Sequence, residues 1–252
     1  MEAIATASGV RAESRNFYVW MAGGFLAVAF GGFIPTFWAK VAAGTFHAEP
    51  IIYIHAALLF SWTCFYFVQT LLVARGRTLD HRAWGLAGIS LFTAMMFSIL
   101  VGEEAVLARN QALGFGEASL RFSAVTLTAW PLMAVIFVLA IVKIRKPETH
   151  KRLMTLLMIG IMTPAIARVF LTLFAPPGLG GPPPPFVATP PGLAADLFLV
   201  VAVVRDWRML GRPHPVYVYG GIALIVQQLL TGPIAATGTW MQIAKGFASL
   251  AH

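Results

Sequence analysis

Polar and charged side chains interrupt the apolar stretches of this sequence, and five of them should lie at a similar depth if those stretches are helices. His55 follows the start of its apolar stretch by about one helical turn, and Glu103 and Glu104 lie at the outer end of the third stretch. Arg168 lies near the outer side of the fifth stretch, and Asp196 in the first turns of the sixth. Because polar groups are costly inside a membrane, each needs a partner or a function. The five residues are His55, Glu103, Glu104, Arg168 and Asp196.

These residues allow three interpretations. A histidine with carboxylates is a donor set suited to Fe, Mn or Zn, so His55, Glu103 and Asp196 are candidate metal ligands. All five residues could instead line a pocket that binds a ligand or cofactor, or relay protons. In the third interpretation no ligand is needed, because Arg168 forms an ion pair with Asp196 or Glu103 that holds helices together.

A second candidate group lies on one face of the helix expected over residues 51–74. It consists of His55, Trp62, Tyr66 and Gln69. Spacings that are multiples of a helical turn place all of these side chains on one side. Such a polar and aromatic face could line a channel or stack against a planar cofactor, such as haem or a quinone. It could also be an ordinary seam at which His and Gln bond to neighbouring helices.

Three further histidines lie among basic residues at the opposite ends of the apolar stretches: His81, His150 and His214. Three converging histidines could bind Zn or Fe or bracket a haem. Basic residues are expected at cytoplasmic helix ends in any case, where they contact anionic lipid headgroups. We therefore interpret this group as structural.

Membrane-spanning helices are the elements that must position these residues. The chain of 252 residues is 58% hydrophobic and 11% charged, whereas a soluble domain carries about 25% charged residues. Most of its apolar segments approach the ~20 residues that a tilted spanning helix needs. The predicted fold is an all-α bundle of seven transmembrane helices in a single domain, residues 1–252, with spans at 17–38, 51–74, 84–107, 122–144, 153–174, 191–204 and 216–234.

The distribution of lysine and arginine predicts the orientation of the bundle. One side carries Arg11, Arg15, Arg75, Arg77, Arg82, Lys143, Arg145, Lys146, Lys151, Arg152, Arg205, Arg208 and Arg212, and the other carries Lys40, Arg109, Arg121 and Lys245. Excess basic charge marks the cytoplasmic face, so we expect the N-terminus inside and the C-terminus outside. Residues 1–15 then form a cytoplasmic segment rather than a cleavable signal, 175–191 a Pro- and Gly-rich outer loop, and 238–252 an interfacial tail.

Several classes of protein are excluded by what the sequence lacks. The net charge of +8 is explained by topology, and no nucleic-acid motif accompanies it. The single cysteine, Cys64, excludes an intrachain disulfide and a cysteine-based metal site. The sequence has no Walker A, G-x-S-x-G, H-E-x-x-H or dinucleotide-binding motif. No span carries the paired histidines of a di-haem cytochrome.

The pieces Ile-His-Ala-Ala-Leu-Leu-Phe-Ser-Trp, Gln-Thr-Leu-Leu-Val-Ala-Arg-Gly-Arg, His-Arg-Ala-Trp-Gly and His-Lys-Arg-Leu-Met stand in spans two, three and five. With them the chain resembles a group of uncharacterised proteobacterial multi-pass membrane proteins over most of its length. This resemblance implies a bacterial inner-membrane location. The last two pieces also loosely resemble segments of small membrane proteins linked to b-type haem or to oxidase assembly.

Three functional classes follow. The first is an inner-membrane protein with a ligand- or cofactor-binding site in the outer leaflet, redox-linked through haem, a quinone or a transition metal. The second is a transporter or channel-like carrier that uses the same residues as a path. The third is a non-catalytic accessory subunit of a larger membrane complex or homo-oligomer. In each, the lipid bilayer and its anionic headgroups are the surrounding partners.

Overall fold

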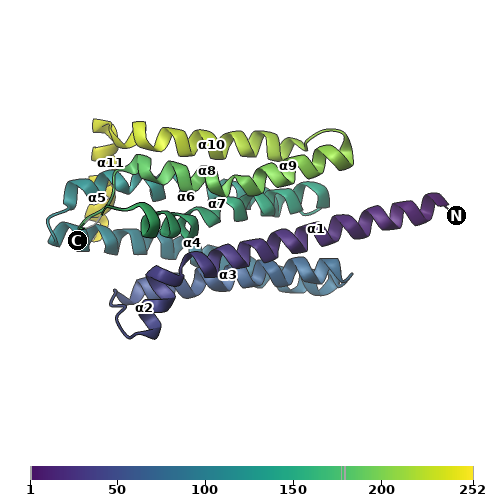
Figure 1. The fold of residues 1–252 in the computed structure, drawn as a ribbon, viewed down its shortest axis with the longest axis horizontal. Coiled ribbons are helices and arrows are strands. Elements are labelled where there is room, and N and C mark those ends of the chain that lie inside the picture. Colours follow the sequence, from purple (N-terminus) through teal and green to yellow (C-terminus); the bar gives the residue numbers. More distant parts are fainter. Residues whose placement is uncertain (1, 177, 179, 252) are drawn as a thin grey trace.

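The computed structural model describes residues 2–176, 178 and 180–251. Within this part of the chain, seven helical segments are long and apolar enough to cross a membrane, and no strand is formed. This confirms the predicted multi-pass helical bundle (Figure 1). The elements are α1 (Glu2–Gly32), the π-helix η1 (Ile34–Trp38), α2 (Ala39–Ala42), α3 (Pro50–Ala74), α4 (Thr78–Ala112), α5 (Gly116–Phe122), α6 (Ala124–Val142), α7 (Pro147–Phe174), the 3₁₀-helix η2 (Pro185–Ala188), α8 (Thr189–Ala195), α9 (Leu197–Leu210), α10 (Pro215–Ala235), α11 (Gly238–Ala248) and the 3₁₀-helix η3 (Ser249–Ala251).

Helix α7 is the centre of the bundle. It packs against α1, α6, α8 and α10. Four consecutive residues, Leu156, Leu157, Met158 and Ile159, are completely buried. Because consecutive residues point to different sides of a helix, protein surrounds this part of α7 on every side.

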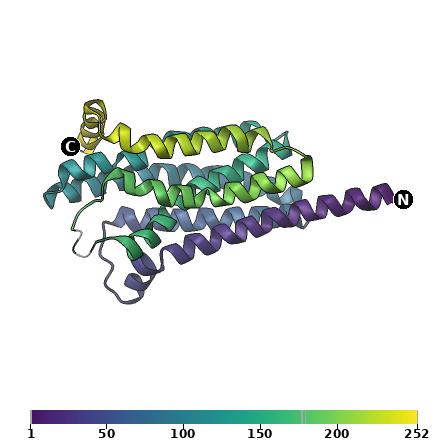
Figure 2. The ribbon, with the colours of Figure 1, turned by 45° about the horizontal axis from the view of Figure 1, so that its top comes forward.

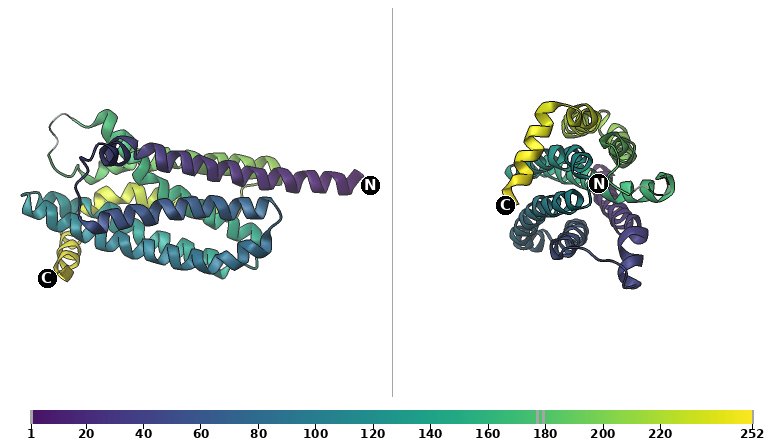
Figure 3. Two further views of the ribbon diagram at one scale, coloured as in Figure 1. Left: turned by 90° about the horizontal axis from the view of Figure 1, so that it is seen from below. Right: turned by 90° about the vertical axis from the view of Figure 1, so that its left-hand side faces the viewer.

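The two ends of the bundle are distinct. The N-terminus and the α3–α4, α6–α7 and α9–α10 connections lie at one end, here called the N-terminal end (Figures 1 and 2). The C-terminus lies at the opposite, C-terminal end. Helix α11 crosses this end (Figure 3), where the indole Nε1 of Trp240 donates to the carbonyl of Leu120 at 2.9 Å. The expected interfacial tail is thus a short helix fixed to the bundle.

The helices extend beyond the apolar segments from which they were predicted. The sixth span was placed at 191–204, but its helical elements run from Pro185 to Leu210. The third was expected to start at 84, whereas α4 starts at Thr78. Apolar composition marks the part of a helix that contacts lipid, while helix ends continue into the polar headgroup layer. Asp196 therefore lies near the middle of the sixth span rather than in its first turns.

Helices α1 and α7 approach each other closely at Gly32. An added Cβ there would lie 2.8 Å from the backbone carbonyl carbon of Ala165. Small residues permit such close approaches between membrane helices. Directly after Gly32 and Phe33 the chain forms the π-helix η1, in which the amide of Trp38 donates to the carbonyl of Phe33 at 3.1 Å.

Candidate functional site

His55 is held in a defined orientation by α4. Its Nδ1 lies 3.0 Å from the hydroxyl of Ser98, and that hydroxyl donates to the carbonyl of Met95 at 2.7 Å. A serine hydroxyl has one proton, so Ser98 must accept from His55, and we assign the ring proton to Nδ1 on this basis. The Nε2 atom keeps its lone pair, and no hydrogen bond to it is formed by the described residues.

Arg168 lies near His55 at the C-terminal end of α7. It is six residues before Phe174, the last residue of α7, or about 9 Å along the axis. Its guanidinium carbon is 5.8 Å from the centre of the Phe33 ring. The side chain is exposed on the lateral surface of the bundle, so lipid or a ligand must surround it.

Arg168 forms no ion pair with a carboxylate in the described part of the chain. The predicted pairs with Asp196 and Glu103 are therefore wrong. Glu103 faces Thr126 on α6, and Asp196 lies in the middle of the sixth span. Hydropathy indicates roughly how far along its helix each residue lies, but not which neighbouring helix its side chain faces.

Aromatic rings form a wall beside Arg168. The ring of Phe60 lies 5.6 Å from Phe33, 4.8 Å from Phe30 and 4.7 Å from Trp38. Among the described residues, the Nε1 of Trp38 and the hydroxyl of Thr36 are buried without a hydrogen-bond partner. The wall thus presents flat apolar rings, with two unpartnered polar groups buried in the same segment.

The candidate metal ligands are not gathered. No group of three or more His, Cys, Asp or Glu side chains that could hold a metal ion occurs in the described residues. His55, Glu103 and Asp196 therefore do not form such a group. Glu104 is half-buried near Glu103 and takes part in no ion pair within the same residues.

The remaining members of the α3 stripe belong to the packed core. Trp62, Tyr66 and Gln69 are buried, and the ring of Trp62 lies 5.0 Å from that of Phe92. The hydroxyl of Tyr66 is 3.2 Å from that of Thr155 on α7. Trp62 and Tyr66 therefore pack at an interhelical seam, whereas the amide of Gln69 has no hydrogen-bond partner in the described residues and His55 keeps an unused ring nitrogen.

The most strongly buried charges form a pair that the sequence did not reveal. Arg152 on α7 donates from Nε and Nη2 to the carboxylate of Asp206 on α9 at 2.7 and 2.8 Å. The two side chains are 1% and 0% exposed. Arg152 also donates to Glu148 at 2.6 Å. From the sequence, Arg152 counts only as one of the basic residues on one side of the bundle. The signal that could have revealed the pair is Asp206, an acid between Arg205 and Arg208.

The histidines of the N-terminal end separate into two places. The rings of His81 and His150 lie 6.3 Å apart, and Nδ1 of His150 is 2.8 Å from the carbonyl of Ala140. His214 instead caps α10 by accepting a hydrogen bond from the amide of Val216 at 3.2 Å. The three histidines therefore do not converge on one ion.

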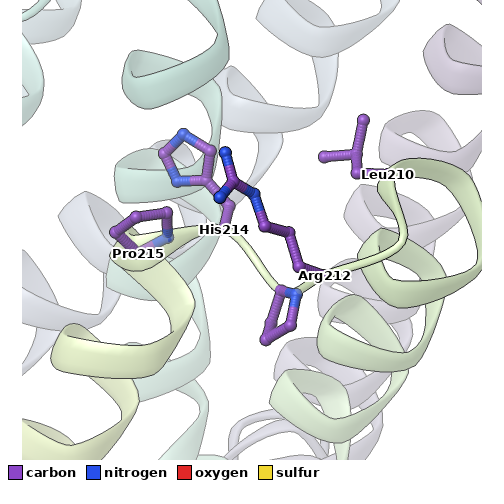
Figure 4. A pocket seen from close by; sticks show the side chains of 5 residues that line it. Leu210, Arg212, His214 and Pro215 are labelled. Atoms are coloured by element: carbon purple, nitrogen blue, oxygen red, sulfur yellow. The ribbon is translucent and has the colours of Figure 1, made fainter.

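A shallow pocket of about 350 Å³ lies beside His214, lined by Leu210, Arg212, Pro213, His214 and Pro215 (Figure 4). Burial, together with the nearby charge of Arg152, lowers the pKa of His214. A neutral ring can accept the hydrogen bond that caps α10. This explains a structural role for His214 at the N-terminal end.

No model of a protein family, no curated protein and no solved structure matches this chain. The structure by itself shows a multi-pass membrane protein built as a seven-helix bundle.

Proposed function

We propose that this chain is a bacterial inner-membrane protein that binds a membrane-soluble redox ring, a quinone or a haem, at His55 and Arg168 in the outer half of the bilayer. One observation carries the proposal: an oriented histidine with a free Nε2 lies at the same end of the bundle and at a similar depth as an arginine that has no ion-pair partner in the described chain. An arginine cannot give up its charge in proteins. A partner for it must come from the ligand or from a lipid headgroup.

The chemistry of the neighbourhood favours a ring with polar edges. A quinol hydroxyl could donate to Nε2 of His55 while its second oxygen accepts from Arg168. A haem would use Nε2 as an axial ligand and Arg168 to bind a propionate. In both cases the ring would lie against the aromatic wall of Phe33, Phe60 and Trp38. A bare metal ion fits less well, because no further protein ligands are gathered.

The orientation of the bundle is part of the same proposal. Arg75, Arg77, Lys143, Arg145 and Arg212 stand in the connections at the N-terminal end, which supports placing that end in the cytoplasm. We expect reporter fusions at Gly180 and at the C-terminus to give an outer-side signal, because both follow an odd number of spans. A cytoplasmic signal from either fusion would contradict the orientation.

Replacing the two site residues tests the binding proposal. His55→Ala and Arg168→Gln are each expected to remove the bound ring from the purified protein while leaving most of the fold intact, since neither residue balances a buried charge. The measurement is an absorption spectrum together with mass spectrometry of an organic extract. A Soret band indicates haem, and an extracted quinone indicates the alternative.

Two controls make this test specific. His47→Ala changes an exposed histidine near the same end of α3 and should leave the bound ring in place. Replacing His81, His150 and His214 together with glutamine should also leave it in place, because these residues lie at the opposite end of the bundle. Loss of the ring in the triple variant would move the site to the N-terminal end.

Other outcomes would contradict the proposal. A protein that is colourless, free of quinone and unchanged by Arg168→Gln would indicate that Arg168 only reaches lipid phosphate. Flux of a solute through reconstituted vesicles would then favour a carrier. Stoichiometric co-purification of other membrane subunits would favour an accessory subunit.

A further inference from the structure

A second polar position lies inside the sixth span. Asp196 is at the junction of α8 and α9, eleven residues after the start of the span at Pro185 and fourteen before its end at Leu210. It is 6% exposed. Neither of its carboxylate oxygens has a hydrogen-bond partner in the described residues. A buried carboxylate in a membrane normally pairs with a cation, a donor or a proton.

Gln228 on α10 stands beside this carboxyl. It is 8% exposed, and its Oε1 also lacks a partner within the described part of the chain. Its side chain lies against Gly192, one helical turn before Asp196: a Cβ added to Gly192 would be 2.8 Å from the amide carbon of Gln228. The hydroxyl of Thr189 donates to the backbone carbonyl of Gln228 at 3.3 Å, which ties α8 to α10 at this point.

Fixed charges do not satisfy Asp196. The elements packed against α8 and α9 are α1, α7, α10 and η2, and none of the ion pairs among the described residues includes Asp196. The charged and titratable residues on α1, α7, α9 and α10 are Glu2, Arg11, Glu13, Arg15, Tyr18, Glu148, His150, Lys151, Arg152, Arg168, Arg205, Asp206, Arg208, Tyr217 and Tyr219. Apart from Arg168, these belong to the N-terminal parts of α1, α7 and α10 or to the second half of α9, away from the middle of the span.

Asp196 and Gln228 thus bring two carboxylate oxygens and one amide oxygen without a partner into one region of the described bundle, and the Nε2 of Gln228 is a neutral donor that cannot balance the charge of the carboxylate. We propose that Asp196 and Gln228 form a binding site for a small monovalent cation, H⁺ or Na⁺. A proton would convert the carboxyl into a donor to Oε1 of Gln228, and Na⁺ would be ligated by the same oxygens. A divalent ion would leave an uncompensated positive charge, because one carboxylate supplies only one negative charge.

The position resembles the way membrane carriers bind coupling ions. In such proteins a carboxylate or helix interruption near the middle of the membrane binds H⁺ or Na⁺. The site is separate from His55 and Arg168, and the proposal does not depend on whether those residues bind a ring. The cation site gives a function to the junction between α8 and α9, which takes no part in the proposed binding of a ring.

Thermal stability in detergent tests the cation site. A ligand that binds only the folded protein raises its Tm as its concentration rises. If the site binds Na⁺, we expect the Tm of the unmodified protein to rise with the Na⁺ concentration at fixed pH, and not with the K⁺ concentration. If the site binds H⁺, we expect the Tm to rise as the pH falls at fixed ionic strength. Asp196→Asn should remove that dependence, because asparagine provides a neutral group and its own donor. Asp80→Asn, which changes an exposed acid paired with Arg77, should retain it.

Labelling with dicyclohexylcarbodiimide gives an independent readout that needs no folded variant. This reagent modifies a carboxyl group that carries a proton in an apolar setting, and mass spectrometry locates the modified peptide. Protection of Asp196 by Na⁺ identifies the sodium site, and protection only by raised pH identifies the proton site. If Asp196→Asn does not fold, Gln228→Leu should weaken the same dependence of Tm. The proposal is overturned if the Tm of the protein and of a folded variant respond alike to Na⁺ and pH, or if neither cation changes labelling or Tm.

Discussion

Replacing Arg152 with alanine is expected to cost the folded protein about 3–5 kcal/mol, the range found when one partner of a buried ion pair is removed. The carboxylate of Asp206 is 0% exposed and receives two hydrogen bonds from Arg152. Without the guanidinium the carboxylate would keep, among the described residues, only the contact from Arg205, whose Nη1 donates to Oδ1 at 3.1 Å, and Oδ2 would be left without a donor. The measurement is the Tm of the purified protein in detergent, with the folded yield as a second readout.

Two companion variants separate the loss of charge pairing from the loss of packing. Arg152→Met combined with Asp206→Leu removes both buried charges and should recover much of the stability. The remaining partners, Arg205 and Glu148, have side chains that are 15% and 64% exposed and can reach water. Lys151→Met removes the adjacent basic residue, whose partner Glu148 has a side chain that is 64% exposed, and should change stability by about 0–1 kcal/mol. Equal losses from Arg152→Ala and Lys151→Met would argue against a special role for the pair.

Gly32→Ala should destabilise the bundle by about 1–3 kcal/mol, the usual cost of overpacking. The new Cβ would collide with the backbone carbonyl group of Ala165, and a backbone atom in the central helix cannot rotate away. Helix α1 would have to move off α7. Since Phe33 and Arg168 meet just beyond this crossing, the shift should also weaken ring binding at His55.

The neighbouring glycine provides a matched control. A Cβ on Gly31 would meet no atom within 4 Å, and alanine favours a helix over glycine by about 1 kcal/mol. Gly31→Ala should therefore leave the Tm unchanged or raise it. A Gly32→Ala variant as stable as Gly31→Ala would show that α1 and α7 are not as closely packed as the structure describes.

The spans could be predicted from the sequence because length and apolar composition determine which segments cross a bilayer. The partners of the buried charges could not be predicted in this way. Arg168 and Asp196 do not form an ion pair with each other, whereas Arg152 and Asp206 do. Hydropathy says how deep a residue lies, but pairing depends on how each helix is rotated, and that is determined by packing across the whole bundle.

The contacts made by small polar residues also could not be predicted from the sequence. Ser98 orients His55 and Gln228 faces Asp196, yet serine and glutamine are common at helix seams and gave no distinct signal. His55 was identified because an isolated histidine in an apolar helix is unusual. The structure adds that Nε2 is the ring nitrogen without a hydrogen-bond partner in the described residues. A histidine can ligate a metal or accept a hydrogen bond only through such a nitrogen.

The π-helix after α1 lets the aromatic wall keep its register with one residue more than a regular helix would hold. A π-turn is an α-helix that accommodates one extra residue, so the helix on either side of it keeps its phase. The same extra residue in a regular α-helix would rotate everything after it by about 100°, and Trp38 would then leave Phe60. In related chains, a one-residue gap between Ile34 and Trp38 should therefore accompany a regular α-helix at this point, with the wall kept.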